Sequence, residues 1–213
     1  MWQKVTDDKD LEEYIEIGVK FWDVSYPKDY LKSGEVWVCK NGSGRIVSGF
    51  AIVKDIPLRT LEFFTPEMRR KAPVISKFDD SHFCEIAGYF VDPTISSKLE
   101  AIRYFSKVVE VVNNLRVPFV IWGFKANKGL ERLYIEKCGG SMIYKGSKFA
   151  GNAQSNSNQT DVIIATISVT RMRMNLFIEK FRRMFTKKKR GVHQLYGEQR
   201  VEHSEDYRST LLE

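Results

Sequence analysis

The chain has 213 residues and a net charge of +7, with 43% hydrophobic and 29% charged residues, a balance that excludes an intrinsically disordered protein. No run of about 18 uncharged apolar residues occurs, which excludes a transmembrane helix. The acidic N-terminal stretch lacks the apolar run of a signal peptide, so a cytoplasmic protein is expected, in a host cytoplasm or a virion if it is viral.

The N-terminal part of the chain predicts a strand, a helix and then a β-hairpin. Residues 2–6 suit a short strand, and acidic residues at 7–10 precede apolar residues at helical spacing, including Leu11, Ile15 and Val19. Residues 35–54 alternate between apolar and polar side chains on both sides of an NGSG turn, which is typical of a hairpin. Residues 57–77 are less regular and carry a small basic spot around Arg69, expected on a solvated face.

The segment from Cys84 to Gly140 organises the rest of the chain. It predicts a strand (82–91), a helix (97–115) after the Asp92-Pro93 turn, a strand (117–124), and a second helix (127–138) closed by two glycines. This order is a parallel β-α-β crossover with an added helix. A ligand is expected at the carboxyl ends of the strands, beside the helix N-termini.

The C-terminal part predicts two more strands (141–149 and 161–169), which end the folded body near Val169. The expected fold class is α/β (α+β), with a mixed, mostly antiparallel, twisted sheet around one central parallel β-α-β unit. The expected domains are a folded domain (1–169), a basic amphipathic helix (170–190, with its helical part at 174–185) and a flexible polar tail (191–213).

The second helix of the central unit carries the most specific motif. Tyr134 follows Asn127 by seven residues and Gly139 follows Tyr134 by five, while Glu85 lies near the start of the strand that ends at Val91. In these spacings residues 2–169 resemble the GNAT superfamily of CoA-dependent N-acyltransferases. One departure concerns the loop of form Q/R-x-x-G-x-G/A that binds the CoA pyrophosphate in that family. Here Ser96, Leu99 and Ala101 hold its places, so the Arg and the first Gly are missing.

The resemblance implies an acyltransferase that moves an acyl group, acetyl first of all, from CoA or another thioester to an amine. Acetyl-CoA or another acyl-CoA would be the cosubstrate, with no metal. By the resemblance, Glu85 would take the amine proton and Tyr134 would protonate the departing sulfur. Asn127 would hold the pantetheine arm, a backbone N–H near Val91 would bind the thioester carbonyl, and the hydroxyls of Thr94, Ser96 and Ser97 would contact phosphate.

Simpler interpretations of the same residues stay open. Glu85 would lie on the polar face of its strand, Tyr134 would be a core aromatic residue, and Asn127 would cap its helix in either case. The cysteines and histidines are too dispersed for a disulfide framework or a zinc site. Cys84 is expected to be a small core residue, with a nucleophilic pairing to His82 as an alternative.

The basic charge is concentrated between Arg171 and Arg190, which holds nine Lys or Arg residues against one Glu and leaves the rest near neutral. This segment would bind an anionic membrane surface or nucleic acid, or pack on the body or on a partner chain in an oligomer. Two hypotheses follow. The first is a divergent GNAT acyltransferase with an amine acceptor. The second is a catalytically degenerate GNAT-fold scaffold, such as a phage virion protein, that binds through this basic segment.

Overall fold

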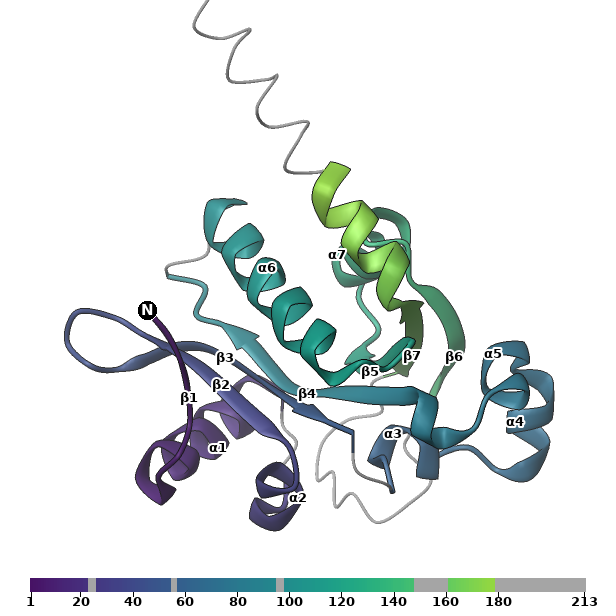
Figure 1. Ribbon diagram of the computed structural model, residues 1–213, viewed down its shortest axis with the longest axis horizontal. Helices are drawn as coiled ribbons and strands as arrows, with labels where there is room; N and C mark the ends of the chain where they lie inside the picture. Colours follow the sequence, from purple (N-terminus) through teal and green to yellow (C-terminus); the bar gives the residue numbers. More distant parts are fainter. Residues whose placement is uncertain (23–25, 55–56, 95–97, 148–160, 179–213) are drawn as a thin grey trace, which may run out of the picture. The chain divides into compact units, whose positions relative to one another are not determined.

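A computed structural model describes residues 1–22, 26–54, 57–94, 98–147 and 161–178 (Figure 1). The chain separates into two compact units, Met1–Arg173 and Met174–Glu213. Several sequence predictions fall outside the described residues: the hydroxyls of Ser96 and Ser97, most of the basic helix, and the polar tail. No helix within the described ranges is long and apolar enough to cross a membrane.

The first unit is built on one seven-stranded sheet. In spatial order its strands are β1 (Trp2–Lys4), β2 (Glu35–Lys40), β3 (Ile46–Val53), β4 (Phe83–Val91), β5 (Phe119–Lys125), β7 (Asp161–Ser168) and β6 (Ser141–Ser147). The β4–β5 pair is parallel and the other neighbouring pairs are antiparallel. The predicted mixed sheet around one parallel unit is therefore confirmed.

Strand β7 lies between β5 and β6, although it is last in sequence. Its central residues Ile163, Ile164 and Ala165 are fully buried, as expected of a strand covered on both faces. Strand β6 is more polar, with exposed Ser141 and Met142, and forms the edge. Burial of the apolar residues of β7 on both faces therefore accounts for its inner position.

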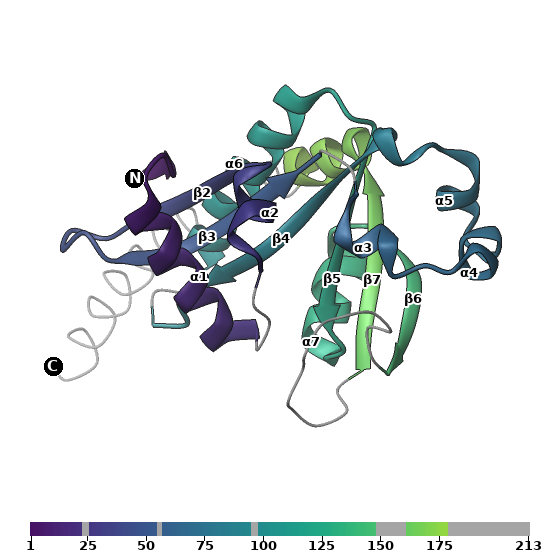
Figure 2. The ribbon, with the colours of Figure 1, turned by 90° about the horizontal axis from the view of Figure 1, so that it is seen from below.

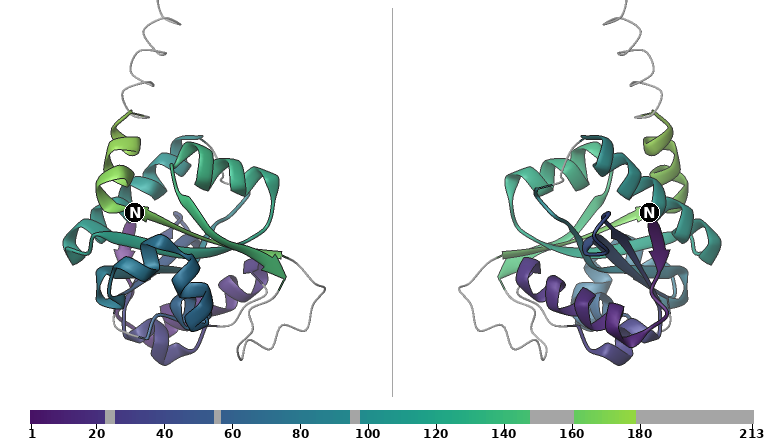
Figure 3. Two further views of the ribbon diagram at one scale, coloured as in Figure 1. Left: turned by 90° about the vertical axis from the view of Figure 1, so that its right-hand side faces the viewer. Right: turned by 90° about the vertical axis from the view of Figure 1, so that its left-hand side faces the viewer.

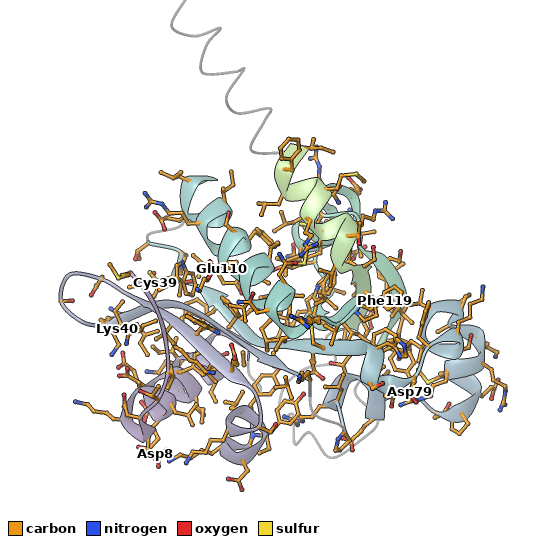
Figure 4. The ribbon with its side chains drawn as sticks, in the orientation of Figure 1. Asp8, Cys39, Lys40, Asp79, Glu110 and Phe119 are labelled. Atoms are coloured by element: carbon orange, nitrogen blue, oxygen red, sulfur yellow. The ribbon has the colours of Figure 1, made fainter. Side chains whose placement is uncertain are left out.

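Helices cover both faces of the sheet (Figure 3). Helices α6 (Lys98–Leu115) and α7 (Lys128–Glu131) pack on one face. The other face carries α1 (Asp8–Trp22), α2 (Lys28–Lys32), α3 (Arg59–Glu62), α4 (Pro66–Lys71) and α5 (Pro73–Lys77). Side chains from helices and strands meet on both faces (Figure 4). Successive side chains of a strand point to opposite faces of the sheet. Each residue of β4 or β5 therefore faces one helical layer, and the next residue along the strand faces the other.

The hairpin β2–β3 forms as predicted. The side-chain oxygen Oδ1 of Asn41 accepts hydrogen bonds from the backbone N–H groups of Ser43 and Arg45, at 3.1 and 3.0 Å. Gly44 takes a φ of +82°, which suits a residue without Cβ. The turn is thus closed by local contacts of the kind that the NGSG sequence supplies.

Two local predictions were wrong. The second helix of the central unit is a short α7 followed by a π-helical segment, Arg132–Lys137, in which the Cys138 N–H reaches the Leu133 carbonyl at 2.9 Å. A helix occupies residues 169–178, so the helix expected from residue 174 begins directly after β7.

The basic spot around Arg69 lies on a solvated face, as expected, because Arg70 and Lys71 are exposed. Arg69 itself is half-buried, and its guanidinium pairs with Asp80 at 2.7 Å and donates to the Leu61 carbonyl.

Candidate active site

Strands β4 and β5 pair only at their beginnings. The register joins Phe83 to Phe119, Cys84 to Val120 and Glu85 to Ile121, and no pair follows. Beyond Glu85 the two strands diverge (Figure 2). We call the unpaired parts, Ile86–Val91 of β4 and Trp122–Lys125 of β5, the β4–β5 fork. Along Ile86–Val91 the backbone edge of β4 that faces β5 has no strand partner among the described residues.

A β-bulge lies inside the fork. Gly49 pairs with Phe90 and Ala51 with Ala87, so Phe50 of β3 opposes two residues of β4, Gly88 and Tyr89. Gly88 adopts a φ of +54°, in the left-handed region. The sequence analysis expected a backbone N–H near Val91 to bind the thioester carbonyl. The irregular backbone of β4 lies three residues earlier, at Gly88.

Tyr14 of α1 holds this bulge from the face opposite α6. Its hydroxyl donates to the carbonyls of Ala87 and Gly88, at 3.2 and 2.7 Å. A Cβ on Gly88 would lie 2.5 Å from the Tyr14 hydroxyl, and one on Gly49 would lie 2.9 Å from the Tyr14 ring. The two glycines therefore make the room in which Tyr14 fixes the backbone of the fork.

Glu85 is the last residue of β4 that pairs with β5, and it lies at the vertex of the fork. Its side chain is buried, with 2% exposure, and Oε2 accepts the backbone N–H of Thr60 at 2.8 Å. Burial raises the pKa of Glu85, although hydrogen bonds from Thr60 and Tyr30 and the charge of Arg59 act in the opposite direction. The alternative of an exposed Glu85 on a polar strand face is therefore wrong.

Tyr26 and Tyr30 connect Glu85 to the bulge. Burial and the charge of Glu85 raise the pKa of Tyr26 to about 12, while a backbone hydrogen bond from Gly88 lowers it. The same two causes, burial first, raise the pKa of Tyr30, whose hydroxyl is hydrogen-bonded to Glu85. Both phenols are thus protonated at neutral pH, and the Gly88 N–H points to the Tyr26 oxygen beside Glu85.

Tyr134 lies at the fork on the α6 face of the sheet. Its ring centroid is 5.1 Å from that of Phe124 and 6.0 Å from that of Trp122 on β5, and 5.8 Å from that of Tyr89 on β4. The Tyr89 hydroxyl donates to the Gly123 carbonyl of β5 at 3.3 Å. Burial raises the pKa of Tyr134, and a hydrogen bond with Tyr89 lowers it. Tyr134 therefore contacts both strands just beyond the point where they part.

Several solved structures of N-acyltransferases have a similar fold. FeeM, an N-acyl amino acid synthase from uncultured soil microbes, matches with a TM-score of 0.63 and 12% identity, over 85% of this chain and 97% of that chain. A ribosomal-protein-alanine N-acetyltransferase from Brucella melitensis matches with a TM-score of 0.52 and 11% identity, over 79% and 99%. An N-acetyltransferase from Staphylococcus aureus Mu50 matches with a TM-score of 0.52 and 10% identity, over 79% and 98%.

The chain has the GNAT fold. At these identities the likeness shows the fold alone, and the residues of the site have to be argued from their own contacts. No protein-family model matches the sequence, and no curated protein matches it. The predicted resemblance over residues 2–169 is thus confirmed at the level of the fold.

At the GNAT pyrophosphate position Leu99 stands where the family has a glycine. The Leu99 side chain is 54% exposed and does not pack into the fork. The nearby carboxylates are paired with arginines, Asp92 with Arg45 and Glu100 of α6 with Arg103. The hydroxyl of Thr94 already donates to Asp92 at 2.6 Å. Ser96 and Ser97 lie outside the described residues, so their predicted contacts stay predictions.

The other predicted site residues have clear local roles. Asn127 caps α7, since its Oδ1 accepts from the N–H groups of Gly129 and Leu130 at 2.8 and 3.4 Å. Cys84 is fully buried, and burial raises its pKa to about 12, which makes it a core residue rather than a nucleophile. No cluster of three or more metal-ligating side chains occurs within the described parts of the chain.

The sequence did not single out Tyr26, Tyr30, Arg59 or Thr60 as site residues. They surround Glu85, yet they come from two short segments that precede it by 25 residues or more, as the Thr60 contact shows. No local spacing links these residues to β4, so tertiary structure alone brings them together.

Replacing Asn127 by Ala should lower the free energy of unfolding by about 1 kcal/mol, because two N–H groups of α7 lose their acceptor. Urea unfolding measures this change, and Asn127→Ser, which keeps a capping oxygen, should lose much less. A loss of acyl transfer in Asn127→Ser at unchanged stability would show that Asn127 also contacts the thioester donor, as the GNAT resemblance implies.

Proposed function

We propose that this GNAT-fold protein is an N-acyltransferase that moves an acyl group from a thioester to a primary amine. The observation that carries the proposal is the β4–β5 fork, with buried Glu85 at its vertex and Tyr134 in contact with both of its strands. Parted parallel strands expose backbone groups that an extended pantetheine arm can pair with, in the manner of an added strand. The names of the similar structures, all N-acyl or N-acetyl transferring enzymes, support the same class of reaction.

Glu85 and Tyr134 approach the fork from opposite faces of the sheet. Glu85 packs among residues of α2 and α3, and Tyr134 packs in the cluster beneath α6. The amine would therefore enter from the α2–α3 side and the thioester from the α6 side. The two reactants would meet in the β4–β5 fork, where β4 and β5 do not pair.

The reaction would then run as a direct transfer. Glu85, whose pKa is raised by burial, takes a proton from the ammonium, and the free amine attacks the thioester carbonyl. The backbone N–H of Gly88 would stabilise the oxyanion in place of its interaction with Tyr26. As the carbon–nitrogen bond forms, the carbon–sulfur bond breaks. Tyr134, protonated because burial raises its pKa, gives its proton to the thiolate, and the second proton that the attacking nitrogen loses restores the phenol. The products are an amide and a thiol, and the proton held by Glu85 passes to water.

The donor would be recognised through its pantetheine arm rather than through its pyrophosphate. The bulk of Leu99, in the place of the family's glycine, disfavours close approach of a nucleotide diphosphate to the start of α6. A thioester of CoA or of another pantetheine carrier therefore fits equally well. Acyl-pantetheine is expected to react with a kcat/KM within about tenfold of that of acyl-CoA, whereas an enzyme that depended on nucleotide binding would lose far more.

The proposal is tested by incubating the full-length protein with acyl-CoA or acyl-pantetheine of several chain lengths and a panel of primary amines. Thiol release is followed with a chromogenic disulfide, and amide formation is confirmed by mass spectrometry. Stoichiometric thiol and amide support the proposal. Thiol release without amide would indicate a hydrolase, and no reaction with any donor would leave the scaffold hypothesis in place.

Replacing Tyr134 by Phe should lower kcat by about 10 to 10²-fold with little change in stability. The phenol proton is lost, while the ring keeps its contacts with Tyr89 and Phe124. The matched control is Tyr104→Phe, on the same face of the sheet, because the buried Tyr104 hydroxyl has no hydrogen-bond partner among the described residues. Equal rates for Tyr134→Phe and Tyr104→Phe would show that the Tyr134 hydroxyl takes no part in transfer.

A further inference from the structure

Arg59 is a cation next to the proposed base, Glu85, and its charge acts to lower the pKa of that carboxyl group. Its guanidinium carbon lies 5.3 Å from the ring centroid of Tyr26 and 5.7 Å from that of Tyr30. Its Nη1 is buried and donates no hydrogen bond to any described residue. Arg59 also forms no ion pair within the described part of the chain. A buried N–H of this kind is unfavourable unless an acceptor reaches it.

The surroundings of Arg59 hold the guanidinium in place. The two tyrosine rings contact it as aromatic partners of a cation, which fixes its position without neutralising its charge. Its own backbone N–H donates to the Tyr30 hydroxyl at 3.4 Å, and Thr60, the next residue, donates to Glu85. Arg59 is thus positioned by the same short segment that binds Glu85.

A fixed guanidinium whose buried Nη1 lacks an acceptor has a well-defined preferred ligand. Its planar fork matches the two oxygens of a carboxylate in a bidentate pair. Arg59 and Glu85 interact electrostatically and are both linked to Tyr30, so a positive and a negative group lie side by side in one cluster. A small molecule with an ammonium next to a carboxylate presents the complementary pair of charges.

We propose that Arg59 binds the carboxylate of the acceptor while its amino group lies at Glu85, so that the acceptor is a free amino acid. The inference rests on the proposed transferase function and specifies its substrate class. The product is an N-acyl amino acid, and its carboxylate stays on Arg59 as the amide forms. Decarboxylated amines leave the Arg59 donors unpaired and are poor acceptors.

The test compares the proteinogenic amino acids with the amines that their decarboxylation yields, as acceptors for the full-length wild type, Arg59→Met and Arg59→Lys. The wild type should prefer the best amino acid over its amine by about 10²-fold or more in kcat/KM. Arg59→Met should bring that ratio close to one, because the rate with the amino acid falls more than the rate with the amine. Arg59→Lys, which keeps the charge but not the fork, should fall between them.

The matched control is Arg70→Met, an exposed arginine on α4, which should leave the preference for amino acids unchanged. Arg59→Met also loses the contacts with the two tyrosine rings, so its melting temperature and that of Arg59→Lys are measured to show that both variants are folded. A wild type that acylates amines and amino acids equally well, or an unchanged preference in Arg59→Met, would overturn the proposal.

A binding measurement separates this proposal from the proposed function. Each amino acid is titrated calorimetrically into the wild type and Arg59→Met, in the presence of a non-reactive thioether analogue of acyl-CoA. Binding to the wild type that Arg59→Met loses, in a protein without transfer activity, would support the carboxylate site and refute the transferase. Transfer to amines without amino acid binding would support the transferase and refute the carboxylate site. The absence of both would refute both proposals.

Discussion

Replacing Glu85 by Gln is expected to lower kcat/KM for acyl transfer by about 10² to 10⁴-fold, the range that a general base contributes. Gln has nearly the same volume and still accepts the Thr60 N–H, but it takes no proton from the ammonium. The loss should appear mainly in kcat, since the proton is removed in the chemical step. Thiol release under saturating donor and acceptor measures it.

Glu85→Gln lowers the rate of transfer, but at neutral pH it should raise the free energy of unfolding. The pKa of Glu85 is raised above its ordinary value of 4.5 in the folded protein, because burial disfavours the carboxylate. Its contribution to stability is therefore fully present below the unfolded pKa and is lost as pH rises through the folded pKa. Glu85→Gln cannot ionise, so its stability relative to the wild type should increase with pH over that window. Urea unfolding of both proteins at several pH values measures the difference.

Glu62→Gln is the matched control, because Glu62 is an exposed carboxylate on α3, close in sequence to Thr60. It should leave the rate of transfer unchanged. If Glu85→Gln retained wild-type kcat, the general-base role would be refuted. The GNAT fold and the fork would remain, but another group or water would have to accept the proton.

Replacing Gly88 by Ala is expected to lower the free energy of unfolding by about 3 kcal/mol. The φ of +54° disfavours any residue with a Cβ, and the new Cβ would lie 2.5 Å from the Tyr14 hydroxyl. Tyr14 must then move, so its hydrogen bonds to the Ala87 and Gly88 carbonyls weaken or break. Urea unfolding at neutral pH measures the loss.

Gly44→Ala separates the two causes. Gly44 has a φ of +82°, yet no atom lies within 4 Å of the position that its Cβ would take. Its substitution should cost only the backbone strain, about 1 kcal/mol. The additional loss in free energy of unfolding for Gly88→Ala, relative to Gly44→Ala, measures the contribution of the Tyr14 contact. Equal losses at the two glycines would show that Tyr14 does not hold the bulge.

Local chemistry made the elements of the chain predictable. The NGSG turn and its flanking alternation predicted β2 and β3, and the Asp92-Pro93 turn predicted the end of β4. Such signals act between residues a few positions apart, and so the sequence carries them directly. The spacing of Asn127, Tyr134 and Gly139 likewise indicated the GNAT fold, even though the segment is wound partly as a π-helix.

Tertiary structure decided the order of the strands and the composition of the site. Strand β7 pairs with β5 because its apolar residues need cover on both faces, a requirement that concerns the whole sheet. Glu85 is buried against Tyr30 and Thr60, which both form hydrogen bonds with its carboxyl group. The Arg59 guanidinium contacts the rings of two tyrosines from another segment. The sequence by itself thus determined the elements and the family likeness. Contacts between distant segments decided burial, charge pairing and the place where two strands part, because these depend on side-chain direction in three dimensions.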